Sequence, residues 1–284
     1  MDDAGVVAHP TNERRSVADA VADAYLGAAW AEGPGLVYDL LAAALVSARP
    51  DPLVGLLVLD LGAGAGAASR AVASAGGNPI AVDVAFDMLR HDRGRRPPAV
   101  VGDGGRLPFK NGAFGAVVMA FVLSHVPDPA RMLADARRVT SPGGMILASS
   151  FSSRSSHPAK IQVDDVAAQW GWQAPPWYER LKSEFEPRVA TLDALADLAR
   201  SAGLHDVIVE EREVSTGISS PEVLVAWRLG MAHLAPFVAA LPGPERARLL
   251  SRAQAAVGDR PHPLRPVMLV LSSRAPARRE RSSA

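Results

Sequence analysis

Cysteine is absent from this sequence of 284 residues, which excludes disulfide bonds, thiolate metal sites and a cysteine nucleophile. An excess of charge is also lacking, because 30 Lys and Arg residues balance 30 Asp and Glu residues. We therefore expect neither nucleic acid nor an anionic membrane as a partner. No run reaches about 18 apolar residues, and the acidic start lacks the apolar segment of a secretory signal. These features favour a cytoplasmic protein, either a monomer or a homodimer.

Aromatic residues are few, at 5% of the chain, and they are unevenly distributed. All five Trp and all three Tyr lie outside residues 51–150. The hydrophobic residues, 48% of the chain, are enough for a sizeable core with a cap. The expected segments are a helical arm (1–50), a sheet core (51–152), an inserted helical cap (153–190), the rest of the core (191–273) with a second cap insertion (220–260), and a disordered tail (274–284).

The stretch from Val58 to Arg70 reads as a strand, a glycine turn and a helix. The Leu and Val residues of 53–59 are typical of a strand buried on both faces of a parallel sheet. Gly62 and Gly64 let the backbone approach a ligand closely, and the following helix offers unpaired N–H groups and a partial positive charge. The turn therefore predicts a nucleotide-like ligand. Its spacing alone also fits a dinucleotide.

An acid stands at the carboxyl end of each of the first three predicted strands: Asp60 at the end of the first, Asp83 as the last residue of the second (79–83) and Asp103 as the last residue of the third (99–103). A carboxylate at Asp60 can accept hydrogen bonds from a cationic amino-acid group, whereas it would repel a pyrophosphate. Asp83 lies 19 residues after Gly64, where a carboxylate can bind both hydroxyls of a ribose. Asp103 can accept from an exocyclic amine, and the backbone N–H of Gly104 can donate to a ring nitrogen of adenine.

Further motifs follow in order: Met88-Leu89, Leu107-Pro108-Phe109, Phe121-Val-Leu-Ser-His125 and Pro142-Gly-Gly144. Together with Asp60-x-Gly-x-Gly-x-Gly, this series resembles class I S-adenosylmethionine-dependent methyltransferases of the ubiquinone-biosynthesis type, over about residues 52–152. The resemblance implies an α/β, Rossmann-like fold. Its mixed sheet has seven strands with the last one antiparallel, helices cover both faces, and S-adenosylmethionine lies across the strand ends. Two positions depart from the family pattern: Gly115 replaces a commoner acid, and Ser124 replaces the first His of a His-His pair.

The predicted cofactor contacts come from the strand ends and from the helical arm that could fold over them. They are Tyr25, Asp60, Gly62, Gly64, Asp83, Val84, Met88, Asp103, Gly104 and Phe121. The aromatic residues of the cap segments either pack their helices together or line a site for an apolar or aromatic acceptor. The candidates for that acceptor site are Trp170, Trp177, Tyr178, Trp227 and Met231.

The expected chemistry uses no metal, because no cluster of His and acids has the spacing of metal ligands. A hydroxyl or ring N–H acceptor would benefit from a general base with a pKa near neutral, which favours histidine. His125 follows the fourth predicted strand, whose end faces the methyl group in the family, and His233 lies in the second cap insertion. The structural alternatives are that His125 packs against the turn at Val126-Pro127 and that His233 faces solvent.

The leading hypothesis is a methyltransferase that acts on the O, N or C atom of a small, largely apolar or aromatic molecule. A protein that binds S-adenosylmethionine without methyl transfer, such as a cyclase or a regulatory subunit, stays open as the alternative. A nicotinamide oxidoreductase would share the glycine turn, but Asp60 and Pro142-Gly-Gly144 disfavour it. The alanine- and arginine-rich composition is typical of actinobacterial-type, GC-rich genomes, in which such enzymes often serve specialised metabolism.

Overall fold

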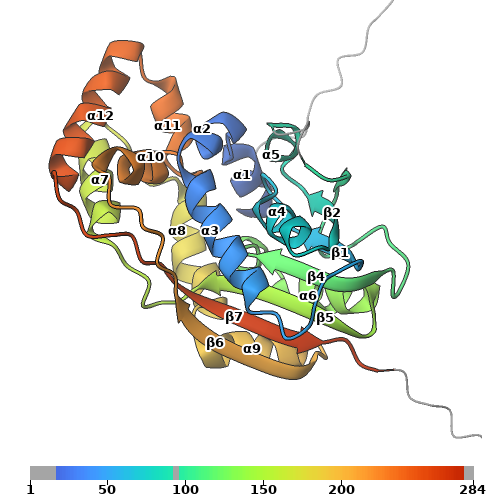
Figure 1. The fold of residues 1–284 in the computed structure, drawn as a ribbon. Helices are drawn as coiled ribbons and strands as arrows, with labels where there is room; N and C mark the ends of the chain where they lie inside the picture. The colour runs from blue at the N-terminus through green and yellow to red at the C-terminus, as the bar shows by residue number, and fades with distance from the viewer. Residues whose placement is uncertain (1–16, 92–95, 278–284) are drawn as a thin grey trace, which may run out of the picture.

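A computed structural model describes residues 17–91 and 96–277 of the chain, and its centre is a mixed sheet (Figure 1). The seven strands have the order β3-β2-β1-β4-β5-β7-β6. They are β1 (Leu57–Leu61), β2 (Asn78–Asp83), β3 (Ala99–Val101), β4 (Phe114–Ala120), β5 (Thr140–Phe151), β6 (His205–Glu213) and β7 (Val267–Arg274). The ladders from β3 to β5 are parallel, whereas β7 is antiparallel to both of its neighbours. The predicted Rossmann-like fold with an antiparallel last strand is confirmed.

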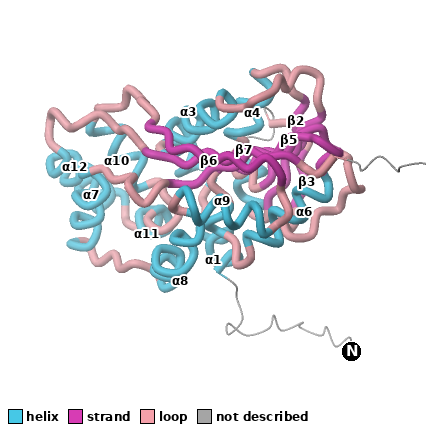
Figure 2. The backbone as a smooth tube through the Cα atoms, turned by 90° about the horizontal axis from the view of Figure 1, so that it is seen from below, coloured by secondary structure: helices cyan, strands magenta, loops and turns pink. Residues whose placement is uncertain are grey.

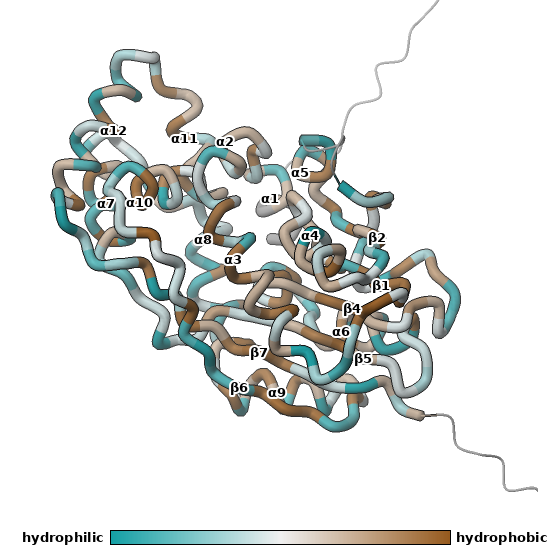
Figure 3. Tube along the Cα trace, viewed as in Figure 1, coloured by the Kyte–Doolittle hydropathy of each residue, from teal (hydrophilic) through white to brown (hydrophobic). Residues whose placement is uncertain are grey.

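Alternate residues of β4 face opposite sides of the sheet, as the period of a strand requires. Ala116 and Val118 belong to a hydrophobic cluster with α3 (Pro34–Ser47) and α4 (Ala67–Ser74). Val117 and Met119 belong to another, with α6 (Pro129–Val139) and α9 (Leu192–Ser201). Figure 2 shows these helix pairs on opposite sides of the strands, and Figure 3 colours much of β1 and β4 hydrophobic. Burial on both faces explains why these strands read as continuous apolar runs.

Four helices from two distant parts of the chain gather at one end of the molecule, at the upper left of Figure 1. We call them the cap helices: α7 (Pro158–Gln169), α10 (Pro221–Leu229), α11 (Ala235–Ala240) and α12 (Gly243–Val257). Helix α7 packs against α10 and α12, and α10 also contacts α3. The chain returns from α7 to α9 through α8 (Pro176–Arg180), a π-helical turn (Leu181–Phe185) and a 3-10 turn (Glu186–Val189). The cap helices share the hydrophobic cluster of α3 and α4, and the division of the chain at 152 and 190 stays a prediction.

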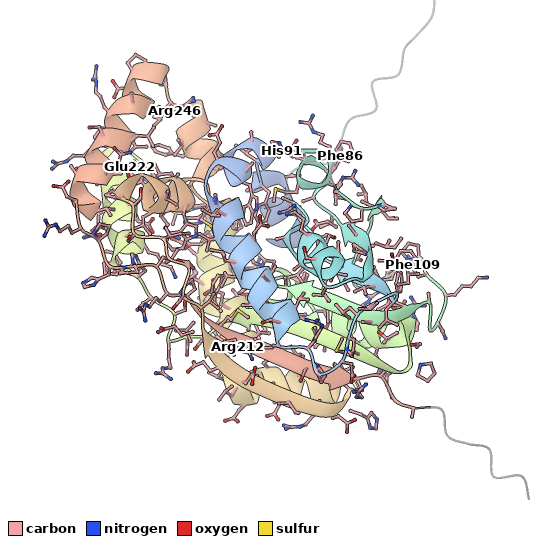
Figure 4. The ribbon with its side chains drawn as sticks, viewed as in Figure 1. Phe86, His91, Phe109, Arg212, Glu222 and Arg246 are labelled. Atoms are coloured by element: carbon pink, nitrogen blue, oxygen red, sulfur yellow. The ribbon has the colours of Figure 1, made fainter. Side chains whose placement is uncertain are left out.

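The N-terminal arm consists of α1 (Val17–Ala24), α2 (Gly27–Glu32) and α3. Its helix α2 contacts α5 (Phe86–His91), and the backbone N–H of Gly27 donates to Asp87 Oδ2 at 3.1 Å. Phe86 and His91, labelled in Figure 4, mark α5 beside this arm. Because α2 also contacts α10, the arm bridges the far end of the sheet and the cap helices.

The tightest contact between the arm and the cap helices is at Gly33, between α2 and α3. A Cβ atom at Gly33 would lie 2.0 Å from the carbonyl oxygen of Ala226 in α10. We expect Gly33→Ala to lower the free energy of unfolding by about 1–3 kcal/mol or more, because backbone atoms must move apart. Thermal and urea unfolding would measure it. Gly243→Ala is the matched control, since nothing lies within 4 Å of that Cβ position, and equal stability of the two variants would contradict the contact.

Several predicted element boundaries were wrong, for local reasons. Strand β1 begins at Leu57 instead of residue 53, because the backbone N–H of Leu56 closes a turn onto Leu53. The apolar run that begins at Phe114 continues to Leu123, but strand β4 ends at Ala120, because Phe121 adopts a positive φ of 57°. In the part of the chain that the structure describes, three helices precede β1, and three lie between 220 and 257. The predicted tail starts too early, since Arg274 still pairs in β7; residues 278–284 lie outside the described residues.

The second cap insertion is interrupted where its apolar spacing continues. Leu224, Trp227, Met231 and Leu234 are spaced as one helix face would be, but α10 ends at Leu229 and Gly230 follows as its C-cap. Arg228, the last residue but one of α10, is only 7% exposed. Its guanidinium pairs with Asp164 of α7, with Nε donating to Oδ1 at 2.7 Å. A half-buried partner 64 residues away in the sequence therefore decides where this charge lies.

Candidate active site

A cavity of about 450 Å³ lies at the carboxyl ends of β1, β2 and β4. Because β1 lies between β2 and β4, the connections leave the sheet in opposite directions at this point, where open α/β sheets bind their ligands. The lining includes all ten predicted cofactor residues: Tyr25, Asp60, Gly62, Gly64, Asp83, Val84, Met88, Asp103, Gly104 and Phe121. His125 lines the same cavity. The cofactor roles of these residues stay predictions, but the fold brings them together.

The glycine turn after β1 requires glycine at its first position. Gly62 has a φ of 75°, and an added Cβ would lie 2.3 Å from Val122 Cγ2. Its N–H donates to the carbonyl oxygen of Val82 at 2.8 Å. The turn is thus bound to the end of β2 and held against the chain after β4. This packing sets the position of Asp60, the last acid before the turn.

Asp60 is fully buried and lines the cavity. Its Oδ2 accepts a hydrogen bond from Ser69 Oγ at 2.6 Å, whereas Oδ1 has no partner among the described residues. Burial raises the pKa of this carboxyl from 3.8 to about 6. A buried carboxylate oxygen without a donor is costly. The position therefore fits a ligand that brings a cationic N–H group.

Asp83 is held by two backbone N–H groups. Gly64 donates to Oδ2 and Ala85 donates to Oδ1, both at 2.7 Å. Burial raises the pKa of Asp83 although both hydrogen bonds oppose that shift. Each oxygen keeps a lone pair, so this fixed carboxylate can still accept from two hydroxyls. The hydrogen bond from Gly64 also ties the glycine turn to the end of β2.

The adenine end of the predicted site is more open. Asp103 lies two residues beyond β3 rather than in it, and its Oδ1 accepts from the backbone N–H of Gly105 at 2.8 Å. Met88 is buried, whereas Val84 is 49% exposed. An apolar floor with one solvent-exposed wall suits a flat ring that keeps one edge in water.

His125 is positioned by a strained residue. Phe121, directly after β4, has a φ of 57°, a left-handed conformation that costs a non-glycine residue about 1–2 kcal/mol. Its carbonyl oxygen accepts from His125 Nδ1 at 2.9 Å. With Nδ1 as the donor, Nε2 carries the free lone pair. Burial lowers the pKa of His125, so the ring is neutral and Nε2 can accept a proton.

Tyr25 meets His125 from the opposite wall. Its hydroxyl lies 3.5 Å from His125 Nε2, and the ring centroids are 6.4 Å apart. Burial raises the pKa of Tyr25, so the hydroxyl stays protonated and can donate. The structural alternative for His125, packing at Val126-Pro127, does not account for a ring exposed to the cavity.

Two aromatic residues of the arm were missed as lining residues. Trp30 and Tyr38 both line the cavity, with ring centroids 4.6 Å apart. The Tyr38 ring also lies 5.5 Å from that of Phe121, edge to face. The aromatic content of the arm was the available signal. It did not separate a wall of the cavity from a helix packed on the sheet, because both present the same apolar stripe.

The five predicted acceptor residues do not line this cavity. Trp227 is 4% exposed and belongs to the main hydrophobic cluster. Trp170 donates through Nε1 to Glu245 Oε2 of α12 at 3.3 Å. Trp177 and Tyr178 instead pack with Tyr25 around Leu181 and Phe185, and Met231 packs against Trp30. Trp177, Tyr178 and Met231 therefore lie behind side chains that line the cavity. The acceptor role of all five residues stays a prediction.

His233 is buried in the cap, so the alternative that it faces solvent is wrong. It is 5% exposed, and its ring stacks on that of Tyr178 with centroids 3.9 Å apart. Burial lowers the pKa of His233 to about 2. Its Nε2 has no hydrogen-bond partner in the described part of the chain. The ring is not among the lining residues, which separates it from His125.

Two further observations concern the described residues alone. Within 17–91 and 96–277, no three His, Asp or Glu side chains are grouped so that they could hold a metal ion. In the same ranges, none of the helices combines the length and the apolar character needed to cross a membrane.

A family model described as a methyltransferase domain matches residues 59–148. A demethylmenaquinone methyltransferase of Thermobifida fusca is 36% identical over 166 residues, which cover 55% of this chain and 68% of that protein. The chain belongs to the class I S-adenosylmethionine-dependent methyltransferases. In a member of this family, the buried Asp60 Oδ1, which lacks a hydrogen-bond partner among the described residues, fits the amino-acid end of the cofactor. The two carboxylate oxygens of Asp83 fit its ribose.

The match to another relative covers a smaller share of that relative's length. A demethylmenaquinone methyltransferase of Renibacterium salmoninarum is 39% identical over 124 residues, 43% of this chain and 51% of that protein. The chain thus spans about half the length of this relative. Among solved structures, the cyclase SpnF has a TM-score of 0.51 at 21% identity, covering 84% of this chain and 82% of its own. That likeness shows the fold alone.

Proposed function

We propose that this protein transfers the methyl group of S-adenosylmethionine to a small, largely apolar or aromatic molecule. One observation carries the proposal. A single cavity joins the three acids at the strand ends to the oriented ring of His125. Binding residues and a proton acceptor thus share one space, as methyl transfer to a hydroxyl or N–H group requires.

The cofactor would lie along the ends of β1 to β3. The free Oδ1 of Asp60 would accept from the cofactor's ammonium group, and Asp83 would accept from the two ribose hydroxyls. Asp103 and the backbone N–H of Gly104 would bind the adenine edge, with Val84 and Met88 against its faces. These assignments follow the order of the residues along the sheet edge.

The chain's own residues would then position the acceptor and remove its proton. S-adenosylmethionine supplies an activated methyl group, so in-line placement of the acceptor provides much of the acceleration. His125 Nε2 would accept the acceptor's proton in place of a hydrogen bond from the Tyr25 hydroxyl, which lies 3.5 Å away, while the carbonyl oxygen of Phe121 holds the ring through Nδ1. Trp30 and Tyr38 of the arm would exclude water from the reacting atoms. Because this chemistry uses no metal, we expect EDTA to leave the rate unchanged.

The acceptor is proposed from the walls of the cavity. Tyr25, Trp30, Tyr38 and Phe121 present aromatic surface to the cavity. The two relatives are named for demethylmenaquinone, a quinone, and a flat ring system of that kind fits such walls. A place in specialised metabolism and the choice of O, N or C as acceptor atom belong to this proposal.

Incubation with methyl-labelled S-adenosylmethionine and a panel of phenols, quinols and aromatic amines tests the proposal. We expect label in an organic product and release of S-adenosylhomocysteine at equal rates. The alternative, a cyclase or regulatory subunit, predicts cofactor binding without transfer to any member of the panel. The fold shared with the cyclase SpnF is the reason to test this alternative as well.

Asp83→Ala tests the cofactor site without an acceptor. We expect the affinity for S-adenosylhomocysteine to fall about 10- to 100-fold, because the ribose loses its charge-assisted hydrogen bonds and Gly64 and Ala85 lose their acceptor. Isothermal titration calorimetry measures the change. Asp197→Ala on α9 is the control, since Asp197 is exposed. An unchanged affinity of the Asp83 variant would remove the ribose assignment.

A further inference from the structure

Beyond the cavity, Lys160 is a cation in an unusual place. It lies in the first turn of α7, where the partial positive charge of the helix disfavours a second positive group. Its Nζ lies 5.8 Å from the ring centroid of Phe151 and 5.9 Å from that of Trp227. Its ammonium group donates a long hydrogen bond, of 3.5 Å, to the carbonyl oxygen of Ser155. Two aromatic rings and a distant carbonyl oxygen stabilise an ammonium group less than the water that burial removes from it.

The other charges around Lys160 are already paired. Arg228 pairs with Asp164, and Lys182 pairs with Glu186. Among the residues that the structure describes, no carboxylate lies within ion-pair distance of Lys160 Nζ. Burial, together with Arg228 and Lys182, lowers the pKa of Lys160 to about 8, while Glu186 and Asp164 oppose the shift. Of these three cations, Lys160 is the one without an ion-pair partner among the described residues.

A short chain of rings connects Lys160 to the cavity. Phe151 is the last residue of β5, the neighbour of β4 in the sheet. Its ring centroid lies 4.5 Å from that of Phe121 and 6.1 Å from that of Tyr38. Phe121 and Tyr38 line the cavity. Lys160 is thus one aromatic ring behind the wall, on the side away from the three acids.

We propose that Lys160 anchors an anionic oxygen of the acceptor, so that the substrate is a flat aromatic molecule bearing a carboxylate or an ionised hydroxyl. This inference rests on the proposed function and deepens it. The ring system would contact Phe121 and Tyr38 from the cavity. The half-buried ring of Phe151, which separates Lys160 from the cavity wall, would turn aside, and the anionic oxygen would then complete the missing ion pair of Lys160. His125, which also lines the cavity, would remain free to accept the proton of the methylated group.

Calorimetry on protein saturated with S-adenosylhomocysteine tests this with two matched probe pairs: 2-naphthoate against 2-naphthamide, and 4-nitrophenolate against 4-nitroanisole. We expect wild-type protein to bind the anion of at least one pair about tenfold or more tightly than its neutral partner. Lys160→Met should abolish that preference, and Lys182→Met should keep it, because Lys182 is exposed and already paired. Equal binding of anion and neutral partner in both pairs, or a preference that survives in Lys160→Met, would overturn the inference.

Two further measurements separate the possible failures. The preference for 2-naphthoate in wild-type protein should decline as pH rises through the pKa of Lys160, about 8, where the ammonium loses its proton. The groups facing Lys160 are Arg228, Lys182, Glu186, Asp164 and His157, and a preference that stays constant to pH 10 would also overturn the inference, even if Lys160→Met does not fold. Failure of wild-type protein to bind S-adenosylhomocysteine contradicts the proposed function instead.

Discussion

His125→Gln should lower kcat by about 100-fold or more once an acceptor is in hand, the usual contribution of a general base. Phe121 fixes the tautomer by accepting from Nδ1, so that Nε2 faces the cavity with its lone pair. The pKa of His125 is lowered by burial. We therefore expect kcat to be flat through neutral pH and to fall only below the ordinary histidine value of about 6.5. Stopped-time assays across pH would record both effects.

His205→Gln is the matched control, since His205 is exposed at the start of β6. His233→Gln isolates the other candidate base. Its ring is stacked on Tyr178 outside the cavity, and we expect kcat to stay within about tenfold of wild type, below the usual contribution of a general base. A loss below tenfold in His125→Gln would leave positioning as the whole of catalysis. A rate restored by Mg²⁺ after EDTA treatment would contradict the metal-free mechanism.

Asp60→Asn should have two large effects of opposite sign. The affinity for S-adenosylhomocysteine should fall at least about tenfold, because an amide replaces the charged partner of the ligand's ammonium group. The ligand-free protein should gain stability at pH 7, on the order of 2–3 kcal/mol, because a fully buried carboxylate with a free Oδ1 no longer has to ionise. Ser69 Oγ can still donate to the amide oxygen, so the turn should keep its shape.

The pH dependence of stability checks the same group. Its pKa is about 6 in the folded protein and 3.8 as the reference value. Between these values the folded state binds the proton more tightly, so stability falls as pH rises from about 4 to about 6 and is then constant. Ligand affinity should rise over the same interval, because the ligand binds the ionised form. Urea unfolding and calorimetry should show both slopes in wild-type protein and smaller slopes in Asp60→Asn, in which Asp83, whose pKa burial also raises, still contributes; parallel slopes in the two proteins would contradict the assignment.

The sequence by itself determined the sheet and the acids at its strand ends. Asp60 lies near the carboxyl end of β1, Asp83 ends β2 and Asp103 comes two residues after β3, and the carboxyl ends of parallel strands meet at one edge of the sheet. Local spacing is therefore enough to bring them together. The glycine turn is also evident from the sequence, because its three glycines lie within five residues, although the contact with Val122 that excludes a side chain at Gly62 is tertiary.

Only the tertiary structure decided which aromatic and basic residues reach the cavity. Trp30 and Tyr38 line it while Trp227 fills the core, although all three lie in apolar helical segments. The positive φ of Phe121, which aims His125, has no signature in a non-glycine residue. The burial of Arg228 and the position of Lys160 depend on Asp164 and on rings from other elements. An apolar stripe along a helix indicates that one face is buried. It does not indicate what buries that face, because the partner is distant in the sequence and is decided by tertiary packing.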